Sequence, residues 1–121
     1  MELENLMAYK KAMEIGEELY RIVDRWTFFD KDTLGKQLVR SADSMAGNIA
    51  EGYGRYFYKE NRQFCYYSRG SMFETGCWIK KAAIREIIPA QTAVELYSEL
   101  ENNKKLLNGY IRSIGRGKIQ A

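Results

Sequence analysis

The chain has 121 residues, a length that fits one domain. Hydrophobic residues make up 45% of it and charged residues 29%, a composition that excludes an intrinsically disordered chain. The formal net charge of +3 permits nucleic-acid binding without requiring it, since dedicated non-specific binders are usually more basic.

The chain has no histidine and only two cysteines. The lack of histidine removes the commonest general base, the usual nucleophilic triads and most zinc sites. Cys65 and Cys77 fall on one predicted helix, about 18 Å apart along its axis, too far for an intramolecular disulfide. We therefore expect reduced thiols in a cytoplasmic protein that is not an enzyme and needs no metal or cofactor. The N-terminus lacks the apolar run of a signal peptide. No segment is long and apolar enough to span a membrane, so we expect no membrane as a partner.

The first predicted helix runs from about Glu4 to Trp26. Its inward residues recur at steps of three and four, as in the seam of a helix bundle. They are Leu6, Tyr9, Met13, Gly16, Leu19, Val23 and Trp26. The pattern breaks after Trp26, and Asp30 and Asp32 are candidate caps for the next helix.

The second predicted helix runs from about Thr33 to Tyr56 and carries two adjoining stripes. The apolar stripe consists of Leu34, Leu38, Ala42, Met45, Ile49 and Tyr53. The polar stripe beside it consists of Ser41, Ser44, Asn48, Glu51 and Arg55. A polar stripe next to a core must meet a neighbouring helix, another subunit or a ligand. Asn48 within it either fixes the register of the helices or donates a hydrogen bond to a ligand.

Residues 58–61 are the predicted junction, and the third helix runs from there to about Arg85. Its inward residues are Phe64, Ser68, Ser71, Met72, Thr75, Trp78 and Ala82. The third helix ends before Pro89, where the fourth begins. The fourth helix has the stripe Ala93, Leu96, Leu100, Leu107, Tyr110 and Ile114. Because the connections are short, we predict an all-α, antiparallel up-down-up-down four-helix bundle over residues 1–115, with a short basic tail at 116–121.

Seven glycines lie inside the predicted helices, where each costs about 1 kcal/mol against alanine. They are Gly16, Gly35, Gly47, Gly52, Gly54, Gly70 and Gly76. Close approach of helices within the bundle explains some of them. Close approach of another subunit or of a nucleic-acid backbone is the alternative for the rest.

A basic and aromatic face on the third helix is the main candidate for nucleic-acid binding. Arg62, Tyr66 and Arg69, with Phe73, share this face at steps of four, three and four. Arginines interleaved with aromatic rings are typical of phosphate contact combined with base stacking. In the alternative interpretation these arginines pair with carboxylates, and Glu51 is the candidate partner of Arg62 or Arg69.

The second helix resembles a family signature. The segment Ser44–Gly52, followed by Gly54 and Arg55, is similar to the signature of the 23S rRNA-intervening-sequence proteins, also called the S23 or four-helix-bundle family. Residues 37–42 and 69–74 match the same pattern. Ala46 and Gly47 depart from the proline and the serine or alanine usual there, so we expect a straighter helix. The signature residues by position are Asn48, Glu51, Gly52, Arg55, Arg69 and Glu74.

This resemblance implies an antiparallel four-helix bundle that assembles into a homopentamer. A related branch, the accessory proteins of diversity-generating retroelements, binds a reverse transcriptase and nucleic acid. We therefore expect a non-enzymatic homo-oligomer that binds structured, rRNA-derived RNA. The candidate RNA-binding residues are Arg40, Arg55, Arg62, Tyr66 and Arg69. The alternative is a scaffold that docks a nucleic-acid enzyme as its protein partner and uses the same residues for subunit assembly.

Overall fold

The computed structural model describes residues 2–116, and the regular secondary structure of these residues is all helical. A 3-10 turn, Leu3–Asn5, precedes helix α1, Met7–Asp24. A short helix α2, Phe28–Asp30, continues through a π-helical turn, Lys31–Gly35, into helix α3, Lys36–Tyr53. Helices α4, Tyr58–Ile84, and α5, Ala90–Ser113, complete the bundle. Of the tail predicted at 116–121, only Arg116 lies within the described residues.

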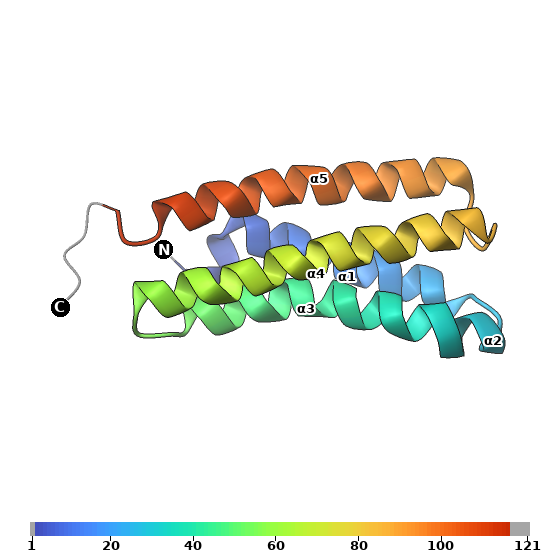
Figure 1. The fold of residues 1–121 in the computed structure, drawn as a ribbon, viewed down its shortest axis with the longest axis horizontal. Helices are drawn as coiled ribbons and strands as arrows, with labels where there is room; N and C mark the ends of the chain where they lie inside the picture. The colour runs from blue at the N-terminus through green and yellow to red at the C-terminus, as the bar shows by residue number, and fades with distance from the viewer. Residues whose placement is uncertain (1, 117–121) are drawn as a thin grey trace.

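Successive long helices run in opposite directions, as Figure 1 shows. Side-chain contacts agree with this course, since Arg62 reaches Ile114 while Arg69, further along α4, reaches Asn108, which lies earlier on α5. The prediction of an all-α four-helix bundle is thus confirmed. Within the described residues, no helix combines the length and apolar character needed to cross a membrane.

The second long helix begins five residues earlier than predicted. Thr27 is extended and its Oγ1 accepts a hydrogen bond from the backbone N–H of Asp30 at 3.2 Å, so Thr27 is the N-cap. Asp30 and Asp32 lie inside the helix, and their prediction as caps was wrong. The apolar pattern gave no sign of this start because Phe28 and Phe29 are 81% and 73% exposed.

The other two connections also differ in detail from the prediction. The α3–α4 connection occupies residues 54–57, so the predicted junction at 58–61 belongs to the first turn of α4. Helix α4 ends at Ile84, before Pro89 can act on it. Glu86 takes a left-handed conformation with φ of 59°, and the N–H of Ile87 donates to the carbonyl of Ala82 at 2.8 Å. This is the hydrogen-bond pattern of a helix stop that usually uses glycine.

The core is a continuous cluster drawn from all four long helices. In α3 the predicted inward residues Leu38, Met45 and Ile49 are fully buried, whereas Tyr53 is 37% exposed. In α1 the buried face is shifted from the predicted one, because Met13 is 45% exposed. The buried residues of α1 are Ala8, Ala12, Ile15, Gly16, Leu19 and Val23. The small residues Ala8 and Ala12 are buried on this face, whereas the sequence pattern favoured the larger Tyr9 and Met13.

A pair of carboxyl groups links α1 to α5. Burial raises the pKa of Glu99, and a hydrogen bond to Glu18 and the charges of Glu18 and Glu14 raise it further, while Lys11 opposes them. A carboxyl whose pKa is higher in the folded than in the unfolded protein stabilises the fold at low pH. That contribution is lost as the pH rises through the folded-state pKa. Ionised Glu99 therefore disfavours the fold at neutral pH.

We expect Glu99→Gln to raise the melting temperature at pH 7, because glutamine keeps a hydrogen-bonding group near Glu18 and removes the repulsion. The difference from the unmodified chain should shrink as the pH falls through the raised pKa of Glu99, and it should be absent below 4.5, the ordinary pKa of a glutamate. Thermal unfolding followed by circular dichroism at pH 7 and below pH 4.5 measures this difference in melting temperature. The matched control is Glu95→Gln, an exposed position of the same helix. An equal gain from both variants would show that overall charge, and not this pair, is responsible.

Candidate nucleic-acid interface

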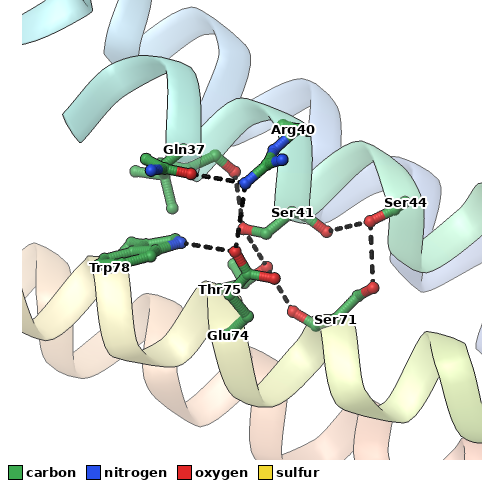
Figure 2. A network of polar contacts seen from close by, with 9 residues as sticks. Gln37, Arg40, Ser41, Ser44, Ser71, Glu74, Thr75 and Trp78 are labelled. Atoms are coloured by element: carbon green, nitrogen blue, oxygen red, sulfur yellow. Dashed lines mark hydrogen bonds and ion pairs between the residues drawn. The ribbon is translucent and has the colours of Figure 1, made fainter. Parts of the chain in front are cut away.

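Five hydroxyl-bearing residues join α3 to α4, and we call them the hydroxyl seam: Ser41, Ser44, Ser68, Ser71 and Thr75. Ser44 Oγ and Ser71 Oγ lie 3.0 Å apart, and Thr75 Oγ1 donates to Ser41 Oγ at 2.9 Å (Figure 2). Ser68 Oγ donates to the carbonyl of Met45 at 2.7 Å. The first half of the predicted polar stripe therefore meets a neighbouring helix, which is one of the three alternatives that the sequence left open.

The second half of that stripe bonds mostly within its own helix. Asn48 Nδ2 donates to the carbonyl of Ser44 at 2.9 Å. Glu51 pairs with Arg55 at 3.1 Å, so the prediction that Glu51 pairs with Arg62 or Arg69 was wrong. The physical reason is position, because Glu51 and Arg55 stand one helical turn apart at the end of α3.

Arg55 closes the α3–α4 connection. Its guanidinium lies 3.1 Å from Glu51, 3.7 Å from Glu60 and 4.7 Å from the centre of the Phe64 ring. Gly52 allows the helices to meet at this end, because a Cβ there would lie 2.9 Å from the carbonyl oxygen of Asn61. Arg55 and Gly52 thus both serve the join between α3 and α4.

Arg40 and Glu74 form a second link between these helices. Arg40 is 3.7 Å from Glu74 Oε2 and donates to Gln37 Oε1 at 2.6 Å. The indole N–H of Trp78 donates to the same carboxylate of Glu74 at 3.1 Å (Figure 2). Arg40 is therefore on the α3/α4 side of the molecule, with its charge matched by a carboxylate.

The predicted face of Arg62, Tyr66, Arg69 and Phe73 lies instead on the side of α4 that contacts α5 and the residue after it. Arg62 Nη1 donates to the carbonyl of Ile114 at 3.2 Å. Arg69 Nη1 donates to Asn108 Oδ1 at 2.8 Å, and its guanidinium stands 4.9 Å above the Tyr66 ring. Both arginines are half-buried, and neither has a carboxylate partner among the described residues.

Lys104 lies beside the same residues, although it was not among those predicted from the sequence pattern. It is 8% exposed, its Nζ lies 3.8 Å from the centre of the Phe73 ring, and it pairs with Glu101 at 2.8 Å. The signal was present, because the stripe between Leu100 and Leu107 needs an inward residue at 103 or 104. We call the set of Arg62, Tyr66, Arg69, Phe73, Lys104 and Asn108 the α4/α5 strip.

The structure therefore separates the predicted RNA-binding residues into two groups. Arg62, Tyr66 and Arg69 lie together in the α4/α5 strip, where their charge is not neutralised. Arg40 and Arg55 lie on the α3/α4 side and are paired with carboxylates. Of the signature residues, Asn48, Glu51, Gly52 and Glu74 all make contacts within α3 or between α3 and α4.

The fold and this strip define a four-helix bundle that carries basic and aromatic side chains where α4 meets α5. The family model of the 23S rRNA-intervening sequence protein matches residues 4–109, and the chain belongs to that family. A crystal structure from Bacteroides thetaiotaomicron VPI-5482, described as a protein with unknown function from the S23 ribosomal protein family, shares the fold. The two structures align with a TM-score of 0.78 and 18% sequence identity, and the alignment covers 88% of this chain and 99% of the Bacteroides chain. No curated protein matches the chain.

Proposed function

We propose that this chain is a non-enzymatic, cytoplasmic protein that binds structured RNA as a homo-oligomer through the α4/α5 strip. The observation that carries the proposal is the pair of half-buried arginines, Arg62 and Arg69, whose hydrogen-bond acceptors are neutral oxygens. Their positive charge is therefore available to phosphates. The rings of Tyr66 and Phe73 beside them are 42% and 61% exposed and offer surfaces for base stacking.

Two glycines are evidence that the chain associates with other molecules. A Cβ at Gly47 or at Gly70 would find no atom within 4 Å, so close packing inside the bundle does not require glycine at either position. Close approach of a second copy or of an RNA backbone would require it. The family resemblance implies a homopentamer, and a ring of copies would repeat the strip and strengthen weak phosphate contacts through avidity.

The test is fluorescence anisotropy of a labelled RNA hairpin between about 50 and 200 mM salt, where phosphate contacts produce a steep loss of affinity. We expect Arg62→Gln/Arg69→Gln to weaken binding by about tenfold or more and to flatten the salt dependence by about one unit for each phosphate that is no longer neutralised. The control is Arg21→Gln, which removes a charge from the exposed face of α1. Equal weakening by the control and by the double variant would reject the strip as the site.

A second candidate function is a scaffold that docks a protein partner. It is favoured by an apolar depression of about 530 Å³ between the end of α4 and the start of α5. Ile84 and Val94 at this depression are 79% and 62% exposed. Under this alternative, neither the unmodified chain nor the Arg62→Gln/Arg69→Gln variant binds RNA at about 50 mM salt. Arg69→Ala would then lower the oligomer mass measured by light scattering.

A further inference from the structure

A second depression lies on the other side of α4, where the π-helical turn and the start of α3 meet the end of α4. Its volume is about 390 Å³, within the range of small-molecule sites. Trp78, Lys81 and Arg85 line it from α4, and Lys36 and Gln37 line it from α3. The α4/α5 strip does not include any of these residues.

The charge of this depression is mainly positive and partly unmatched. Lys36 pairs with Asp32, the one carboxylate of the lining, at 2.7 Å. Lys81 and Arg85 stand one helical turn apart, are exposed, and form no ion pair with any residue between 2 and 116. Two neighbouring cations of this kind suit a phosphate group, which arginine can bind through two hydrogen bonds.

The indole of Trp78 is held in place beside these cations. Its N–H is bonded to Glu74, which Arg40 and Gln37 in turn connect to α3, as Figure 2 shows. The N–H is thus occupied by this hydrogen bond, and the half-buried indole is part of the lining of the depression. Such a ring is a stacking platform for a nucleobase.

The spacing of these groups follows one line along α4. Trp78, Lys81 and Arg85 are separated by three and four residues, so they occupy adjacent positions over about 10 Å of helix axis. Along this line an aromatic ring comes first and two unpaired cations follow. A nucleotide has the same order, with its base at one end and its phosphate at the other. The π-helical turn forms the opposite rim, and such turns are frequent at functional sites.

We propose that this depression binds one nucleotide unit, with its base against Trp78 and its phosphate between Lys81 and Arg85. Lys36 lies across the depression as a third cation. Two sources of the unit share this chemistry, a free nucleoside monophosphate and a nucleotide of an RNA chain. The site uses no residue of the α4/α5 strip and does not depend on RNA binding there.

Isothermal titration calorimetry of the full chain with uridine monophosphate, inorganic phosphate and uridine tests this proposal. We expect a dissociation constant of about 1 mM or tighter for the monophosphate, and at least about tenfold weaker binding of phosphate or nucleoside alone. In a Trp26→Phe background, Trp78 is the single tryptophan, and its fluorescence should change on binding. No binding of the monophosphate at about 5 mM, or equal binding of monophosphate and phosphate, would overturn the proposal.

Variants then locate the site. Lys81→Gln and Arg85→Gln should each weaken monophosphate binding by about tenfold, and Trp78→Leu by a similar factor. Lys59→Gln, an exposed lysine on the first turn of α4, is the matched control and should leave binding unchanged. Arg62→Gln/Arg69→Gln should also leave it unchanged, so that failure of the α4/α5 strip and failure of this site are distinguishable. Loss of binding in both controls would overturn the assignment.

Titrations with two trinucleotides, compared with the monophosphate, distinguish the source of the nucleotide. If 5′-phosphorylated and 5′-hydroxyl trinucleotides both bind more weakly than the monophosphate, the ligand is a free nucleotide. Tighter binding of the phosphorylated trinucleotide alone identifies an RNA end, and tight binding of both identifies an internal unit. Each of these three results supports a nucleotide site. Binding of neither the trinucleotides nor the monophosphate rejects it.

Discussion

Gly52→Ala is expected to lower the free energy of unfolding by about 2 kcal/mol, although alanine is the better helix former by about 1 kcal/mol. The new Cβ would lie 2.9 Å from the carbonyl oxygen and from Oδ1 of Asn61, and 2.9 Å from Cβ of Phe64. Two of these three atoms belong to backbone or to the first carbon of a side chain, so they cannot move without shifting α4. Urea unfolding followed by circular dichroism, at one fixed protein concentration, measures the loss.

Gly47→Ala is the matched control on the same helix. A Cβ at Gly47 meets no atom within 4 Å, so alanine there should raise the free energy of unfolding by about 0.5–1 kcal/mol. Equal stability of the two variants would contradict the close approach of α3 and α4 at Gly52. If Gly47→Ala stabilises the chain but weakens self-association or RNA binding, the glycine serves an external contact.

The sequence predicts the helices well and the helix ends poorly. Leucine, isoleucine and methionine at helical spacing define the buried faces of α3 and α5, because burial of large apolar side chains dominates the packing. The start at Thr27 was missed because two exposed phenylalanines follow it. The spacing of Thr27 and Asp30 was the available signal, since it resembles a capping box in which a side chain accepts from a backbone N–H three residues on.

The site was predictable only within one helix. Arg62, Tyr66 and Arg69 stay together because steps of three and four place residues on one helical face whatever the tertiary structure. Partners on other helices depend on the rotation and offset of each helix, which a single sequence does not determine. The partner predicted for Glu51 was therefore wrong, and the sequence did not indicate that Lys104 belongs to the α4/α5 strip. Trp78 was correctly placed facing the bundle, but its link to Glu74 and Arg40 emerged only from the structure.

Asn103 is a polar residue in the core whose replacement should stabilise the protein. It is 1% exposed, and neither Oδ1 nor Nδ2 has a hydrogen-bond partner among the described residues. A buried polar group without a partner costs about 1–3 kcal/mol. We therefore expect Asn103→Leu, which removes both polar atoms, to raise the free energy of unfolding by about 1–3 kcal/mol.

The neighbouring residue provides the control for this prediction. Asn102 is exposed on the same helix, and Asn102→Leu should change the free energy of unfolding by less than about 0.5 kcal/mol. Urea unfolding of both variants under identical conditions gives the comparison. A loss of stability in Asn103→Leu would contradict the prediction. A gain in stability accompanied by mixed oligomer masses would assign Asn103 to specificity, because a buried polar residue can exclude alternative helix pairings at a cost in stability.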